Sequence, residues 1–94
     1  PIAGNCYIPD RKEYMVISNV TDSQFDFEIY DVDGLCFKHH TAVAISEDTA
    51  RYYGDKYTLT FGLDTQGISV DGCDDIVGSD AFFIYEEWLD DGEN

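Results

Sequence analysis

The chain has 94 residues, which is enough for one domain and too few for two. Its 44% apolar content, with 15% aromatic residues, argues against disorder, because this many large side chains can bury enough surface to offset the loss of chain entropy. Twenty acidic side chains against five basic ones give a net charge of −15, which repels nucleic acid and anionic lipid and excludes both as expected partners.

We expect residues 1–94 to form a single β domain, with residues 1–10 as an N-terminal arm and residues 89–94 as an acidic tail. The first clear periodicity along the chain is at residues 25–29, where apolar and acidic side chains alternate strictly. This pattern predicts a strand with both Phe and the Ile on its core face, and with Asp26 and Glu28 in water. Weaker strands are expected at residues 13–18, 35–39 and 41–46.

Residues 46–53 are the one stretch that favours a helix. Ser46 is a suitable N-cap residue, and Ala50 is a good helix former. The stretch is barely two turns long, so we expect a single helical turn at most.

The next two strands are expected to form a hairpin. Residues 57–63 alternate between large apolar residues and Thr, and residues 68–71 repeat the alternation. The short link at residues 64–67 predicts that these two strands pair as a hairpin.

The last expected strand, at residues 81–86, carries the candidate binding surface. If Phe82 and Ile84 face the core, Phe83 and Tyr85 face outward, and Trp88 follows beside several carboxylates. Aromatic residues rimmed by acids fit a cationic protein surface, although the core and the N-terminal arm could instead cover both faces of this strand. The candidate partner-binding residues are Phe83, Tyr85, Glu86, Glu87, Trp88, Asp90 and Asp91.

Together these elements predict an all-β fold with about seven short strands. Such strands can form a small antiparallel barrel or a sandwich, and closure into a barrel would remove the exposed sheet edges that promote aggregation of small proteins. The negative charge is concentrated toward the C-terminus, because all five basic residues lie within the first 56 residues.

The three cysteines show no C-x-x-C spacing, which argues against a zinc cluster or a thioredoxin-like redox motif. The odd count allows one disulfide and one spare thiol, and we take Cys36 and Cys73 as the disulfide candidates. A short domain that contains cysteine is more typical of an oxidising compartment, so we expect a secreted or cell-surface protein, with the cytoplasm as the alternative.

Two acidic turns are candidate calcium sites. Asp71, Asp74 and Asp75 surround a Gly-Cys pair, and residues 31–34 place two Asp in a turn. Neither stretch completes an EF-hand loop, and Asp residues often start turns and stay solvated, so we expect no cofactor.

No catalytic motif is evident in the sequence, and we do not expect an enzyme. His39 and His40 are adjacent, so on a strand they point to opposite faces and cannot readily share a site. Cys36 lies three residues before His39, but the sequence indicates no third group that would orient the imidazole as a base.

Three features of the second half of the chain resemble small secreted bacterial β-domains with a lysozyme-inhibitor-like barrel layout. They are a Tyr-x-Leu-x-Phe strand at residues 57–61, a Val-x-Gly-Cys turn at residues 70–73 and a Gly-bearing final hairpin at residues 78–83. The chain lacks the Ser-Gly-bearing loop with which the membrane-bound lysozyme inhibitors plug an active site, so the resemblance assigns no inhibitory role to any residue of this chain. The resemblance implies a compact, secreted, non-enzymatic barrel.

The sequence therefore favours an acidic binding or inhibitory module that docks a basic protein, for example an enzyme such as lysozyme, through acidic loops and an aromatic patch. One alternative is an intracellular antagonist, either an immunity protein or a DNA mimic that opposes a nuclease or a DNA-binding protein. A further alternative is a carbohydrate-binding module in which Trp88 and Tyr residues stack on sugar rings.

Overall fold

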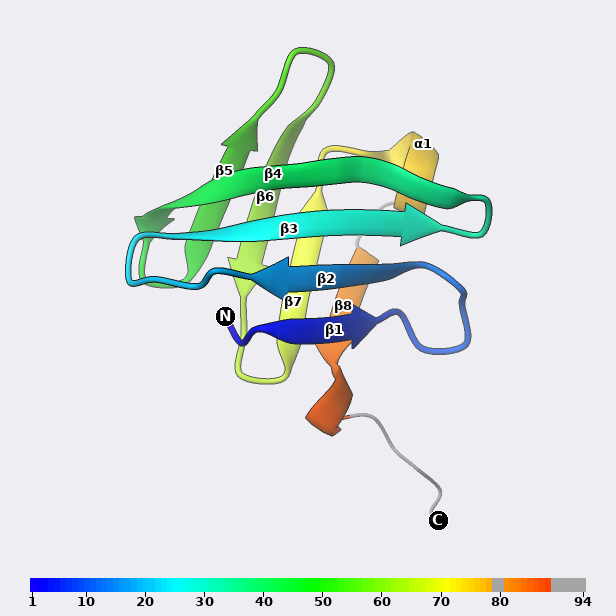
Figure 1. Cartoon of the computed structure of the whole chain (residues 1–94), viewed down its shortest axis with the longest axis horizontal. Helices are drawn as coiled ribbons and strands as arrows, with labels where there is room; N and C mark the ends of the chain where they lie inside the picture. The colour runs from blue at the N-terminus through cyan, green and yellow to red at the C-terminus, as the bar shows by residue number, and fades with distance from the viewer. Residues whose placement is uncertain (79–80, 89–94) are drawn as a thin grey trace.

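A computed structural model describes residues 1–78 and 81–88, and it shows eight antiparallel strands that close into one barrel (Figure 1). The strands follow one another around the barrel in chain order, and the first pairs with the last. They are β1 Gly4–Tyr7, β2 Tyr14–Ser18, β3 Gln24–Asp31, β4 Gly34–Ser46, β5 Thr49–Tyr53, β6 Thr58–Leu63, β7 Gly67–Asp71 and β8 Ala81–Tyr85. The predicted all-β antiparallel barrel is confirmed, with eight strands instead of about seven.

The additional strands lie where the sequence signal was weakest. β1 occupies part of the expected N-terminal arm, and β5 occupies residues 46–53 in part, where a helical turn was expected. No helical turn forms at residues 46–53, where one turn at most was expected, because β5 pairs on both sides and Ala50 is fully buried opposite Phe61 on β6. The two strands expected at residues 35–39 and 41–46 are one continuous strand, β4, since His40 pairs directly with Phe27.

Two short helical segments accompany the barrel. The helix α1, Asp74–Val77, lies between β7 and β8, and the 3-10 turn η1, Glu86–Trp88, follows β8. Val77 is fully buried in the core cluster, so α1 is anchored on one end of the barrel. Within residues 1–78 and 81–88, neither segment has the length and apolar character that a membrane-crossing helix requires.

The barrel interior is filled by aromatic rings packed mainly edge to face. The ring of Phe27 lies 4.9 Å from that of Phe61 and 5.4 Å from that of Tyr52, measured between ring centroids. Phe25 packs against the same Phe61 at 5.4 Å. Phe25, Phe27 and Ile29 all face inward, as their alternation predicted. Aromatic pairs in this geometry add to the stability from buried area alone.

Because consecutive strands are antiparallel, successive loops lie at opposite ends of the barrel. Residues 8–13, 32–33 and 54–57 lie at the same end as α1, which we call the α1 end (Figure 1). Residues 19–23, 47–48 and 64–66 lie at the opposite end, together with residues 1–3 and η1, and we call this the η1 end. Loops that are far apart in the sequence therefore meet at each end.

Candidate binding surface

The structure reverses the predicted faces of β8. Phe83 is fully buried and Tyr85 is 4% exposed, while Phe82 and Ile84 are only partly buried. The register explains this, because Phe83 pairs with the buried Ile68, and directly opposed residues share a face of the sheet. The prediction that Phe83 and Tyr85 form an exposed patch is therefore wrong, and both residues belong to the core.

The remainder of the predicted surface is exposed where the structure describes it. Glu86, Glu87 and Trp88 form η1, and the Trp88 side chain is 50% exposed. Asp90 and Asp91 lie outside the described residues. One aromatic residue and two carboxylates thus remain from the predicted set.

The fold adds carboxylates from distant loops to this surface. Asp22 comes from the β2–β3 loop, Glu47 and Asp48 come from the β4–β5 loop, and Asp64 comes from the β6–β7 loop. All four are exposed. These residues are far apart in the sequence, so their grouping was not predicted. In a barrel whose strands follow one another in chain order, however, alternate loops must lie at the same end. With Glu86 and Glu87, they give the η1 end six carboxylates among the described residues.

The basic residues lie elsewhere on the molecule. Arg11, Lys12 and Lys56 are on loops at the α1 end, while Lys38 lies on β4 and Arg51 on β5. The negative field at the η1 end therefore has no local lysine or arginine to compensate it.

Only two of these six carboxylates, those of Asp48 and Asp64, accept hydrogen bonds from within the described part of the chain. Asp48 accepts hydrogen bonds from Ser46 and Thr49, which hold its pKa below the usual range. Asp64 accepts a backbone hydrogen bond from Gln66 at 3.2 Å. Within the described part of the chain, the other four, Asp22, Glu47, Glu86 and Glu87, make no side-chain hydrogen bond or ion pair. These four are available to an external partner.

Two hollows lie between these carboxylates and the N-terminal residues. The first, of about 330 Å³, is lined by Ile2, Ala3, Gly4, Asn5, Tyr85, Glu86 and Glu87. The second, of about 360 Å³, is lined by Pro1, Ile2, Glu47, Leu63, Asp64, Thr65 and Tyr85. Both contain Ile2, which is 43% exposed. The η1 end thus combines an accessible apolar side chain with an acidic rim.

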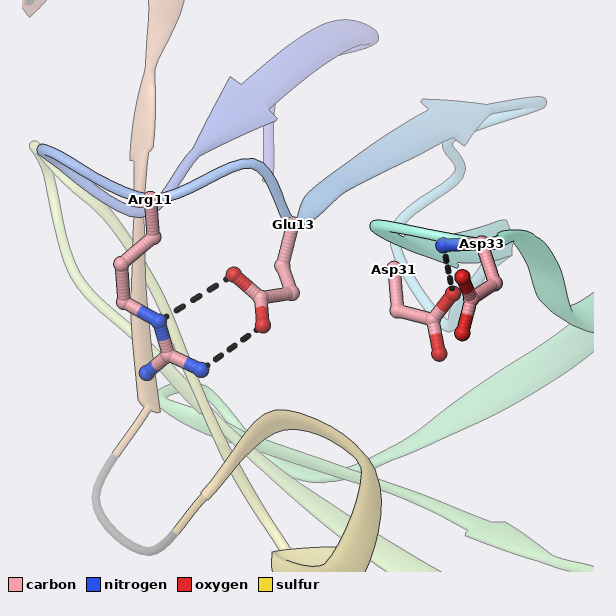
Figure 2. Close-up of polar contacts among 4 residues, drawn as sticks. All are labelled: Arg11, Glu13, Asp31 and Asp33. Carbon is pink, nitrogen blue, oxygen red and sulfur yellow. Dashed lines mark hydrogen bonds and ion pairs between the residues drawn. The ribbon is translucent and has the colours of Figure 1, made fainter.

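At the α1 end, by contrast, two carboxylates, those of Glu13 and Asp31, are satisfied internally (Figure 2). Arg11 donates two hydrogen bonds to Glu13, at 3.1 and 2.8 Å, and this guanidinium lowers the Glu13 pKa. The Cys36 thiol and the backbone N–H of Asp33 both lower the pKa of Asp31. These groups stabilise the loop between β1 and β2 and the turn between β3 and β4.

The candidate calcium residues are not brought together into a metal site. Asp71, Asp74 and Asp75 are all exposed, and the carboxylate of Asp75 accepts a hydrogen bond from Tyr57 at 2.8 Å. Among residues 1–78 and 81–88, no three acidic, His or Cys side chains are arranged to hold a metal ion. Asp74 and Asp75 instead begin α1.

Asp26 forms a polar network that the sequence did not indicate. Its carboxylate accepts hydrogen bonds from Thr41 at 2.6 Å and Asn19 at 2.8 Å, and its Oδ2 lies 2.7 Å from His39 Nε2. Asp26 is only 9% exposed, so the prediction that it lies in water is wrong. These hydrogen bonds, led by that of Thr41, lower its pKa to about 2. The network joins β3, β4 and the β2–β3 loop.

We expect this network to contribute to acid sensitivity. Because the folded-state pKa is about 2 rather than 3.8, Asp26 stabilises the fold above pH 3.8, and this contribution is lost as the pH falls toward 2. The urea unfolding midpoint of the wild type should therefore fall more steeply over this range than that of Asp26→Asn. The exposed Asp55→Asn variant should keep the wild-type slope. Equal slopes for wild type and Asp26→Asn would contradict this assignment.

The two histidines lie in different environments, as predicted from their adjacency. His39 is half-exposed beside Asp26, while the His40 ring lies 4.6 Å from the ring of Tyr52 and packs against Phe27. Asp26 is the group that orients His39, and it was not identified from the sequence because it belongs to a neighbouring strand.

All three cysteines are free, so the bridge expected between Cys36 and Cys73 is not formed in this structure. Burial raises the pKa of Cys6 to about 12, and it is also the main cause that raises the pKa of Cys36 and of Cys73 to about 11. Thiols with such high pKa values are protonated near neutral pH and are poor nucleophiles. This chemistry does not support a nucleophilic Cys36 activated by His39.

Comparison with known proteins gives no match to a family model, to a curated protein or to a solved structure. The resemblance to lysozyme-inhibitor barrels stays a prediction, and functional inference rests on the surface itself.

Proposed function

We propose that this chain is a non-enzymatic binding or inhibitory module that docks a basic protein through the η1 end. The observation that carries the proposal is the gathering of six described carboxylates from four separate segments at an end with no lysine or arginine. Such a concentrated field accelerates encounter with a cationic surface and disfavours nucleic acid.

Apolar contact supplies the second component of the proposed interface. Trp88 and Ile2 are 50% and 43% exposed, and Ile2 lines two hollows that a partner's side chains can enter. Tryptophan is enriched among the residues that dominate binding energy, because it buries a large area with few rotatable bonds. Electrostatic attraction would bring the partner close, and Trp88 would hold it.

Binding to lysozyme, used as a basic probe protein, tests this proposal. Trp88→Ala should weaken the affinity about tenfold or more, the loss typical of an interface hot spot. The matched control is Tyr53→Ala, which removes a 68% exposed aromatic side chain from β5 and should leave the affinity unchanged. Calorimetric titration at low and high salt should show affinity falling as salt rises.

The result is informative in each direction. Salt-dependent binding that is lost in Trp88→Ala alone would support docking at the η1 end. Equal loss in both aromatic variants, or binding that does not respond to salt, would contradict it. A panel of basic proteins extends the test, because the proposal specifies the partner's charge and not its identity.

A further inference from the structure

The seam between β1 and β8, which closes the barrel, is only partly paired. β1 pairs with β2 along its whole length, from Gly4 opposite Ile17 to Tyr7 opposite Tyr14. On its other edge it pairs with β8 at two positions only, Cys6 with Tyr85 and Tyr7 with Ile84. Within residues 1–78 and 81–88, the first half of β1 therefore has a strand partner on one side and none on the other.

The hydrogen-bond alternation identifies which backbone groups face the open part of the seam. The N–H of Tyr85 donates to the carbonyl of Gln66, so the backbone polar groups of Tyr85 point toward β7. Those of the preceding residue, Ile84, then point toward its β1 partner, Tyr7. By the same alternation, the N–H and C=O of Asn5 also point into the seam. At that level β8 has ended and η1 has begun.

Among the residues that the structure describes, a hollow lies beside these groups. The hollow of about 330 Å³ is lined on one side by residues from Ile2 to Asn5 and on the other by residues from Tyr85 to Glu87. Ala3, Gly4 and Asn5 are all exposed, and η1 lies beside β1 across this space (Figure 1). The seam thus presents an accessible strand edge next to a hollow.

We propose that the open half of this seam binds an extended cationic segment by strand addition. It consists of Ala3, which precedes β1, and of Gly4 and Asn5, the first two residues of β1. The inference rests on the proposed function and gives it a binding mode. Main-chain hydrogen bonds to an exposed strand edge would supply affinity, and the alternating side chains of the added strand would supply selectivity.

The surrounding side chains identify a cationic occupant. Glu86 and Glu87 line the hollow, and their carboxylates make no hydrogen bond or ion pair within the described residues, so they can receive lysine or arginine side chains. On the same end, Ile2 and Trp88 offer apolar contacts. An extended segment that alternates basic and β-branched residues meets both requirements.

A synthetic hexapeptide of alternating lysine and valine tests the inference on the full chain. Its binding should slow hydrogen exchange at the Asn5 amide, because that N–H would become a donor to the peptide. The same peptide with alternate backbone nitrogens methylated keeps its charge but loses donors, and it should bind about tenfold or more weakly. Asn5→Pro removes the seam-facing donor and should weaken binding similarly.

The outcomes separate this inference from the proposed function. Equal binding of parent and methylated peptides, with unchanged exchange at Asn5, would overturn strand addition. If that binding still weakened with salt and on Glu86→Gln with Glu87→Gln, the acidic docking surface would stand without strand addition. Failure of every cationic probe to bind would overturn both. The methylated peptide needs no protein variant, so it decides the question even if Asn5→Pro does not fold.

Discussion

Replacing Phe27 by alanine is expected to destabilise the barrel by about 3–5 kcal/mol, the cost typical of removing a large ring from a packed core. Phe27 is fully buried, and its ring lies 4.9 Å from that of Phe61 and 5.4 Å from that of Tyr52. It also packs against His40 and Phe37 on the neighbouring strand. The substitution therefore leaves a cavity that three strands line. Since small domains have only about 5–15 kcal/mol of total stability, the loss is severe.

Chemical denaturation of purified wild type and variant measures this prediction. Tyr53→Ala is the matched control, because Tyr53 is 68% exposed on β5, and its loss should change the free energy of unfolding by less than about 0.5 kcal/mol. A similarly small decrease in the free energy of unfolding in both variants would mean that Phe27 is not at the centre of the core.

Much of the barrel could be predicted from local alternation. Residues 25–29 and residues 57–63 place large apolar side chains at every second position, and their core faces agree with the structure at Phe27, Phe61 and their neighbours. The short link between β6 and β7 made their hairpin predictable. These signals are strong because one face is fully buried and the other is polar.

The errors arose where tertiary pairing decides between local options. β8 contains apolar side chains on both faces, so its alternation was ambiguous, and only its register with Ile68 on β7 places Phe83 inside. β5 contains Ala50, which suits either a helix or a tightly packed strand, and pairing with β4 and β6 selects the strand. A local pattern cannot contain this information.

The candidate surface was even less accessible to sequence reasoning. Glu86, Glu87 and Trp88 were predictable as a cluster because they are adjacent in the chain. Asp22, Glu47 and Asp64 join them only through the order of the strands around the barrel. A sandwich of the same strands, which was the alternative architecture, would distribute these loops differently.

Neutralising the acidic η1 end is expected to slow association with a basic protein by about tenfold or more at low salt, because steering depends on the local field. The test variant combines the substitutions Glu47→Gln, Asp64→Asn, Glu86→Gln and Glu87→Gln. Each replacement keeps the shape of the side chain and leaves the buried core unchanged, so a change in rate reports the charge. Stopped-flow or surface-binding kinetics with lysozyme as the probe measure the association rate.

A variant with the same change in net charge at the other end separates local steering from overall charge. It combines Asp10→Asn, Asp55→Asn, Asp71→Asn and Asp74→Asn, all exposed residues at the α1 end. If the η1 end is the docking surface, this control should slow association far less than the test variant. The difference between them should shrink as salt shortens the range of the field, to about 8 Å at physiological ionic strength. Equal slowing by both variants would mean that net charge alone attracts the partner, and that the acidic loops of the η1 end have no special role.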